Sequence, residues 1–445
     1  MVKQTGTQQL ALLGGPRAVA RDRRVLPWPR VTADDEAAVL RSLRSHAYTS
    51  ASAGEVEISG LEREWADFAG TAYSVAVSNG TTALALALAA AGVQPGSEVV
   101  VPALSFVASA MAPVHLGATP VFADIDPHTF NLDPAAFEAA ISPRTSAVVV
   151  VHLHGLPAEL DEIGVIAARH GVRVVEDAAQ AHGAQYRGRP VGTAGAANSF
   201  SLNVSKNLAT CGEGGLVNTD DPERYRRIVM MRQFGEIIPQ RSERSYVSHL
   251  LGWNYKPNAI QCAFTRSQLA RLPGEQKIRE ENVRRLLGRV SALDGLGVPA
   301  VSDDRTHAWH ILRFRVDPAA FGAPDTPAGP LRAVVMSALR AEGVPVSHYQ
   351  LMPLPAQPAF RGVPGGHSGE EHPVTRQVIE DSFTIQKAHL HPDAGPLLDL
   401  YAEAMEKVWQ HREVLVRRAA ELTYEAPWQR AERIGAAEYG SGQRN

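Results

Sequence analysis

The sequence predicts an α/β protein with a mostly parallel sheet, and two observations support this fold class. Short valine-rich runs alternate along the chain with alanine-rich segments of helical character, which is the pattern of strands joined by crossover helices. The chain has 445 residues, 44% of them hydrophobic, and is long enough for two domains and a large core. The expected strands of this sheet are 73–77, 98–101, 120–124, 147–151, 172–177 and 198–202.

The later part of the chain predicts a smaller α/β domain. A charged amphipathic stretch at 279–289 is interpreted as the helix that leaves the large domain. We predict a large domain over 30–285 and a small C-terminal domain over 286–424, with 1–29 packing nearby. Within and beyond the small domain we expect a strand at 309–316, a helix at 330–342, a strand at 344–349, a Gly/Pro-rich surface loop at 361–372, a terminal helix at 410–423 and a polar, frayed tail at 425–445.

One lysine, Lys206, lies between a short apolar strand and a glycine-rich turn in the segment 199–215. The chain has only six lysines, and arginine carries nearly all of its positive charge. A lysine amine, unlike a guanidinium, can form a Schiff base with a carbonyl when a pocket partly desolvates it. By position alone a solvated loop lysine is the commoner interpretation, so the neighbouring motifs must decide.

An acidic pair ends the valine-rich run at 172–177. Ligands bind at the carboxyl edges of buried parallel strands, and Asp177 stands at such an edge. A carboxylate there can hydrogen-bond a protonated pyridine nitrogen, which makes a pyridoxal phosphate ring an electron sink. Alternatively, Asp177 caps a helix that begins in the following Ala-Ala-Gln segment. Glu176 is expected to face the other side of the strand.

Two further segments suit the same cofactor. Asn79-Gly80-Thr81-Thr82 follows an expected strand and opens an alanine- and leucine-rich helix, so free N–H groups and the positive end of the helix dipole would meet there at a phosphate site. The same residues also suit a plain N-cap turn. Phe106 follows the strand tip at 101–105 and could stack on a pyridine face, although an aromatic at a strand end also suits the core.

In this order and spacing, these four elements resemble the fold-type I pyridoxal-phosphate enzymes, specifically the DegT/StrS family of sugar aminotransferases. The likeness is strong over about 52–272 and includes 117–124, 152–155 and 252–255. It implies that Lys206 is the Schiff-base lysine, Asp177 the pyridinium partner and Phe106 the stacking residue. It also implies that Gln180 contacts the phenolic oxygen edge of the cofactor, that Gly80, Thr81 and Ser201 bind its phosphate, and that Asn254 reaches the phosphate in the neighbouring subunit of a homodimer with shared active sites.

The resemblance further implies transamination from glutamate or glutamine to a carbonyl acceptor by ping-pong kinetics, because family members that dehydrate sugars carry histidine where Lys206 stands. Nucleotide-sugar members carry a His-Tyr-x-Pro-Leu-His segment, from which 348–353 departs. Segments 12–16 and 27–29 look more like the branch that acts on cyclitol ketones or makes aminohydroxybenzoate for antibiotics. We therefore expect the acceptor to be a cyclitol or other secondary-metabolite carbonyl first, and a nucleotide-bound ketosugar second. The remaining alternative for the protein's function is a non-catalytic sensor or scaffold that binds pyridoxal phosphate.

Composition argues against other partners. The net charge of −3 and pI near 6.6 give no electrostatic footprint for nucleic acid. No signal sequence or membrane span is expected, and two cysteines suggest no disulfide framework, so we expect a cytoplasmic protein. His152 and His154 lack a carboxylate or cysteine at ligand-like spacing, so no metal site is expected.

Overall fold

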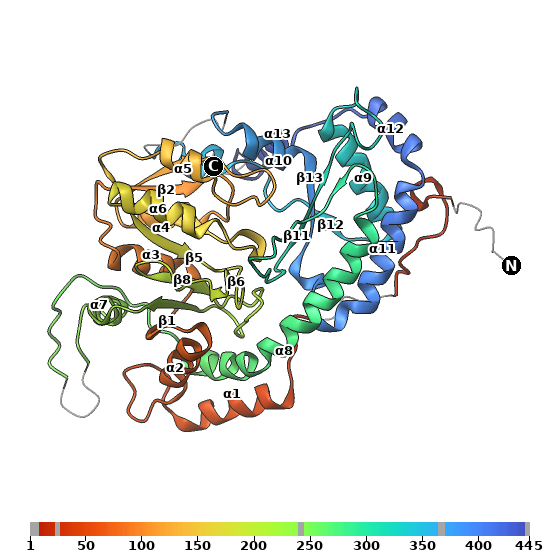
Figure 1. Ribbon diagram of the computed structural model, residues 1–445. Helices are drawn as coiled ribbons and strands as arrows, with labels where there is room; N and C mark the ends of the chain where they lie inside the picture. The colour runs from red at the N-terminus through yellow and green to blue at the C-terminus, as the bar shows by residue number, and fades with distance from the viewer. Residues whose placement is uncertain (1–8, 23–26, 239–243, 364–369, 441–445) are drawn as a thin grey trace.

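The computed structural model describes residues 9–22, 27–238, 244–363 and 370–440, with the side chains of 435–440 left out. Figure 1 shows two units side by side, a large domain around one sheet and a small domain around another, with the helix α8 (Ala259–Val290) running from one to the other. The fold is the mostly parallel α/β arrangement that the sequence predicts, and each sheet packs against its own hydrophobic clusters.

The sheet of the large domain has seven strands in the order β1-β9-β8-β5-β4-β2-β3. Strands β2 to β5 and β8 pair in parallel, whereas β9 is antiparallel to both of its neighbours. All six expected strands are present. The seventh strand, β9, is not among the predicted strands, because the glycine-rich residues at its start indicate only a turn. The strands are β1 Tyr73–Val77, β2 Glu98–Pro102, β3 Thr119–Ala123, β4 Thr145–Val151, β5 Arg173–Asp177, β8 Asn198–Ser201 and β9 Gly215–Thr219.

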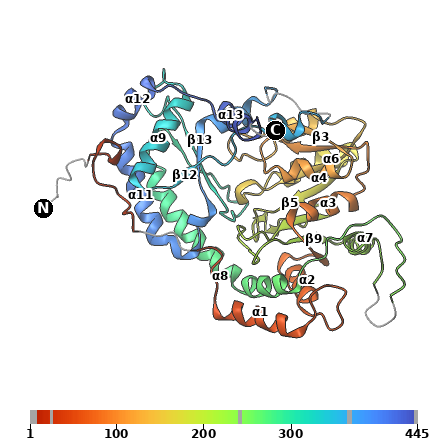
Figure 2. The same ribbon diagram turned by 180° about the vertical axis from the view of Figure 1, so that it is seen from behind.

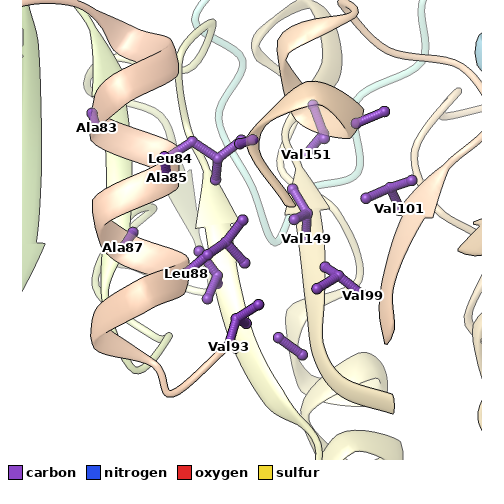
Figure 3. Packing of buried hydrophobic residues seen from close by; sticks show 14 of the residues in the cluster. Ala83, Leu84, Ala85, Ala87, Leu88, Val93, Val99, Val101, Val149 and Val151 are labelled. Carbon is purple, nitrogen blue, oxygen red and sulfur yellow. The ribbon is translucent and has the colours of Figure 1, made fainter. Parts of the chain in front are cut away.

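Helix α3 (Gly80–Ala90) explains how the first motif is held. Its alanines and leucines are buried on nearly every side, and Figure 3 shows them against Val99, Val101, Val149 and Val151 of the sheet. Burial of this kind fixes the helix start next to the strand ends. The other helices of the large domain are α1 Ala33–Ser45, α2 Glu57–Ala69, α4 Ala108–His115, α5 Pro134–Ala139, α6 Leu160–His170 and α7 Pro222–Arg232, and a short hairpin joins β6 Gln185–Tyr186 to β7 Arg189–Pro190.

The small domain is built on an antiparallel sheet in the order β10-β11-β13-β12. Its expected strand and helix are present as β11 (Leu312–Val316) and α9 (Ala328–Glu342), with the helices on the outer side in Figure 2. Its other strands are β10 Leu296–Gly297, β12 Val346–Ser347 and β13 Ser382–Ile385, and its other helices include α10 Pro373–Asp381, α11 Gly395–Trp409 and α12 Arg412–Glu421.

Short 3₁₀ helices occur in both domains. In the described residues they are η1 Ala11–Leu13, η2 Leu153–Gly155, η3 Leu354–Ala356, η4 Pro358–Phe360, η5 Lys387–His389 and η6 Pro392–Ala394.

Helix α8 is much longer than the expected 279–289 and passes through the proposed domain boundary at 285/286, which stays a prediction. Its N-terminal half packs on α1 and α2 and its C-terminal half on α11. From the N-terminal segment, Leu10 and Val19 join the core of the small domain. Part of that segment, residues 1–8 and 23–26, lies outside the described residues.

The prediction of a frayed tail at 425–445 is wrong for residues 427–440, because these residues form helix α13 (Pro427–Gly440). Proline at the first helical position suits a helix start, and Trp428 anchors the helix beneath the guanidinium of Arg376, 4.6 Å from the ring centroid. Residues 441–445 lie outside the described residues, as do 364–369 of the expected loop. Among the described helices, none is both long and apolar enough to cross a membrane.

Candidate active site

A cavity of about 640 Å³ opens at the carboxyl edge of the large sheet and is lined by both domains. The structure brings together there every predicted site residue except Asn254. From the large domain the lining includes Gly80, Thr81, Phe106, Asp177, Gln180, Ser201, Lys206 and Glu213, and from the small domain it includes His310, Tyr349 and Lys387.

The helix start at Gly80 forms one end of this cavity. Asn79 caps α3, because its side-chain oxygen accepts the N–H of Thr82 at 2.9 Å. The amides of Gly80 and Thr81 belong to the first turn, where no helix carbonyl can accept from them. A Cβ on Gly80 would lie 2.6 Å from the Cβ and 2.8 Å from the Oγ of Ser201. Glycine is therefore needed for the hydroxyl of Ser201 to approach the helix start, and together these donors suit a phosphate.

Asp177 ends β5 at the floor of the cavity and is 8% exposed. Its Oδ2 accepts the hydroxyl of Ser109 at 2.8 Å, and its Oδ1 accepts the N–H of Ala179 at 3.2 Å. No helix begins in the described residues that follow, which form turns, so the helix-cap alternative is wrong. The carboxylate is held in a fixed orientation and keeps acceptor capacity for a protonated ring nitrogen.

Glu176, the neighbouring acid, faces the other side of the strand as expected. Its carboxylate binds the Nε2 of His152 at 2.8 Å and accepts the N–H groups of Gly192 and Ala194 at 2.7 and 2.6 Å. Burial alone would raise the pKa of Glu176, but these hydrogen bonds and the charge of His152 outweigh it and lower the pKa. His152 therefore forms structural hydrogen bonds at the end of β4, to Glu176 and to the N–H of Ala158. The described residues contain no cluster of three or more metal-ligating side chains.

Lys206 projects into the cavity from the loop after β8 and is only partly exposed. Burial and the nearby ammonium of Lys387 lower its pKa to about 8, and the carboxylates of Asp177 and Glu213 act in the opposite direction. A lysine with a lowered pKa carries a useful fraction of neutral, nucleophilic amine near neutral pH. This environment rules out the interpretation of Lys206 as a solvated loop lysine.

The small domain supplies residues that sequence reasoning did not assign to the site. The Oε1 of Gln180 accepts the N–H of His154 at 2.7 Å, and its Nε2 donates to the hydroxyl of Tyr349 at 2.9 Å. Lys387 lies in the same cavity, partly buried, and burial lowers its pKa. The scarcity of lysine in the chain is the sequence signal that could point to Lys387. For Tyr349 the sequence offers only its place in segment 348–353.

Phe106 and Asn254 lie in different surroundings. Phe106 lines the cavity and is 57% exposed, so the core alternative is wrong. Asn254 is exposed, pairs with Gln233 through an isolated bridge, and accepts a hydrogen bond from Lys256. It does not line the cavity of its own chain, although the adjacent Tyr255 does. Its contact across a subunit interface stays a prediction.

Comparison with known proteins identifies the class. Residues 29–393 match the DegT/DnrJ/EryC1/StrS aminotransferase family, and the chain belongs to it. The chain is 35% identical to the dTDP-3-amino-3,4,6-trideoxy-alpha-D-glucose transaminase of Streptomyces venezuelae over 86% of its own length and 95% of the relative's. It is 36% identical to the L-glutamine:2-deoxy-scyllo-inosose aminotransferase of Streptoalloteichus tenebrarius, over 87% and 96%. The crystal structure of 3-amino-5-hydroxybenzoic acid synthase superposes with a TM-score of 0.76 at 30% identity, over 89% and 99%.

The protein is therefore a pyridoxal-phosphate-dependent aminotransferase. We call the start of α3 at Gly80 and Thr81, together with Ser201, the phosphate cradle. The cavity fits the cofactor, since this cradle, the carboxylate of Asp177 and the amine of Lys206 line one space. When bound, the cofactor supplies an electron sink for the substrate carbon. The individual roles of these residues stay predictions. We predict that Ser201 and the start of α3 hold the phosphate and that Asp177 keeps the ring nitrogen protonated. We also predict that Gln180 orients the ring edge and that the amine of Lys206 carries the proton to and from the substrate carbon.

Proposed function

We propose that this enzyme transfers an amino group from glutamate or glutamine to the carbonyl of a cyclitol or related secondary-metabolite precursor. The observation that carries the proposal is the joint lining of one cavity by Lys206, Asp177 and the phosphate cradle at Gly80. A lysine with a pKa of about 8 next to a fixed carboxylate has the two functions that transamination requires of the protein, a nucleophilic proton carrier and a counter-charge for the ring.

The amino donor is inferred from Lys387. Lys387 lines the same cavity as the predicted cofactor-binding residues, and the described residues offer its ammonium no hydrogen-bonded or ion-paired partner. A partly buried cation without an anion is unfavourable, and a substrate carboxylate at this position would compensate it. We therefore assign Lys387 to the carboxylate of the amino-acid donor.

The acceptor is inferred from the relatives and from segment 348–353. The relative from Streptoalloteichus tenebrarius is named for a neutral cyclitol ketone and matches over nearly its whole length, which supports a cyclitol and a role in antibiotic biosynthesis. A nucleotide-linked ketosugar is the second candidate, supported by the transaminase of Streptomyces venezuelae.

We also propose a homodimer with shared sites, located in the cytoplasm. Of the connection between α7 and α8, the described residues 233–238 and 244–251 extend away from the body of the chain in Figure 1. Apolar side chains on this segment are exposed, with Leu251 at 94%, Tyr246 at 75% and Ile237 at 61%. Apolar residues gathered in this way are typical of a protein interface, and Asn254 lies in the same segment. The cysteines, Cys211 and Cys262, are both free, which supports a reducing compartment.

Half-reaction spectroscopy tests the proposed substrates. Purified holoenzyme is mixed with L-glutamine, L-glutamate or L-alanine, and the absorbance of the bound cofactor is followed until amination is complete. The aminated enzyme is then mixed with 2-deoxy-scyllo-inosose or with a dTDP-ketosugar. We expect L-glutamine or L-glutamate to aminate the cofactor fastest and the cyclitol ketone to return it. If only the nucleotide sugar restores the original absorbance of the cofactor, the acceptor is a nucleotide-linked ketosugar and not a cyclitol. If no amino donor changes the absorbance, the proposal is wrong.

A further inference from the structure

A second, polar cavity of about 200 Å³ lies in the small domain, on the other side of the chain segment that carries Tyr349. It lies between α9, the segment after β12 and the connection from α12 to α13. His348 lines this cavity, whereas the next residue, Tyr349, lines the active-site cavity. Among the described residues, none lines both. We call this second cavity the arginine pocket, after Arg332, Arg340 and Arg430 in its lining.

The charge of the arginine pocket is unbalanced. In the described part of the chain, none of its three arginines forms an ion pair with a carboxylate of the protein. Glu425 is the acidic residue of the described lining, and both of its oxygens accept hydrogen bonds from Arg433, at 2.9 Å each. Three arginines, of which Arg340 and Arg430 are exposed, therefore line a small space, and the single carboxylate of its described lining is already ion-paired.

Arg332 shows how deeply the charge is placed. It is 2% exposed, and its guanidinium donates to the carbonyl of Glu380 at 2.8 Å, the Nε2 of His348 at 2.7 Å and the hydroxyl of Tyr424 at 3.1 Å. All three acceptors are neutral groups, because burial and the neighbouring arginines lower the pKa of His348 to about 3. The charges of Glu380 and Asp381 act on Arg332 without forming an ion pair with it, and Asp381 is already paired with Arg315. A buried cation without an ion-paired anion is costly, so a bound anion would complete the pocket better than water.

We propose that the arginine pocket binds a phosphate-class dianion, either inorganic phosphate or the phosphate group of a small metabolite. Guanidinium forks match the oxygen geometry of phosphate and form short, charge-assisted hydrogen bonds with it. A dianion also balances three cations and a neutralised carboxylate better than a monoanion does. Because His348 and Tyr349 are consecutive, an anion bound in the pocket holds the backbone from which Tyr349 reaches Gln180. This inference does not depend on the identity of the donor or acceptor.

Calorimetric titration of the holoenzyme tests the proposal. Bound cofactor fills the phosphate cradle at Gly80, so added inorganic phosphate reports on other sites. Titrations at pH 8 and constant ionic strength compare the wild type with Arg340→Gln and Arg430→Gln, which alter exposed side chains and leave the buried Arg332 in place. Arg417→Gln, on the exposed face of the neighbouring α12, is the matched control.

We expect saturable binding to the wild type and the control, and at least about tenfold weaker binding to each pocket variant, the usual scale for a lost hydrogen bond to a charged group. Saturating phosphate should also raise the Tm of the wild type and the control more than that of the double variant, by mass action. No saturable binding to the wild type, equal affinity in the pocket variants, or acetate binding as tightly as phosphate would each overturn the proposal.

Discussion

The two sides of the active-site cavity are built from different kinds of groups. The large domain contributes backbone amides, a short hydroxyl side chain and a carboxylate fixed at strand ends or a helix start, as at Gly80, Ser201 and Asp177. Its longer lining side chains, which lie on loops next to these ends, are Phe106, Gln180, Lys206 and Glu213. The small domain contributes longer side chains, Tyr349 and Lys387, from an irregular segment and a 3₁₀ turn. Short groups on a rigid sheet lose little conformational freedom on binding, which suits a permanently held cofactor. Longer side chains on loops suit substrates that come and go.

This difference predicts that changes on the large-domain side abolish chemistry, whereas changes on the small-domain side alter substrate affinity. Lys206 belongs to the first group by position, but its pKa depends on both sides, because burial and Lys387 lower it while Asp177 and Glu213 raise it.

Replacing Lys206 with alanine should reduce transamination by at least about 10³-fold, because the predicted cofactor attachment and the predicted proton carrier would be lost together. Steady-state kinetics measures the loss. Borohydride reduction of the wild type should fix the cofactor to the peptide that contains Lys206. Lys277→Ala is a control, since Lys277 lines a different cavity. Recovery of the label on Lys387, the other lysine of the same cavity, would move the catalytic amine to the small-domain side and break the comparison.

Asp177→Asn preserves shape and removes the charge that we predict keeps the ring nitrogen protonated. We expect kcat to fall by about 10²- to 10³-fold, the scale for losing a fixed catalytic charge, while the cofactor stays bound. The measurement pairs steady-state kcat with the bound-cofactor absorbance. Glu213→Gln, which neutralises the other carboxylate near Lys206, is the matched control and should retain far more activity. Near-normal kcat in Asp177→Asn would show that a different acid serves the ring.

The sequence predicted the large-domain side well for a physical reason. Each of its functional groups is fixed by a local pattern, such as a strand that ends on Asp177 or a helix capped by Asn79, and parallel strands bring such ends to one edge. Lys387 and Tyr349 follow no such pattern. They reach the cavity only because β11, β12 and β13 pair antiparallel and α8 sets the small domain against the large one, and long-range packing of this kind leaves no local signal.

Lys387→Gln should raise the KM for the amino-acid donor by about 10- to 100-fold, the usual scale for a lost hydrogen bond to a charged group, with a much smaller effect on the KM for the neutral acceptor. Separate titrations of the two half-reactions measure both constants. Lys387→Arg keeps the charge and should recover part of the affinity. Equal increases for donor and acceptor would indicate a general distortion of the cavity, and an unchanged donor KM would remove Lys387 from donor binding.

Asn254→Ala should weaken cofactor affinity by about 1 to 3 kcal/mol if the asparagine reaches the phosphate of the partner subunit. Equilibrium dialysis against pyridoxal phosphate measures this loss, and sedimentation shows whether the dimer persists. At a cofactor concentration that leaves Asn254→Ala homodimers largely empty, mixing them with inactive Lys206→Ala subunits should restore some activity, since each heterodimer contains one intact site. Heterodimers that form and stay inactive would place Asn254 outside the shared site.

The smallest expected effect couples the two sides through pH. If Lys206 is the attachment point of the cofactor, only its neutral amine can react, so loading of the apoenzyme should slow as the pH falls below the pKa of about 8. Lys387→Met removes a like charge, which favours the protonated amine and raises the pKa of Lys206. Asp177 and Glu213 act in the same direction in both proteins. At pH 7.5 the variant should therefore load about two- to fivefold more slowly, with its profile moved to higher pH, whereas Lys387→Arg should follow the wild type. The absorbance of bound cofactor across a pH series measures each profile. An unmoved profile, or one moved to lower pH, would show that the small-domain side does not tune the catalytic lysine.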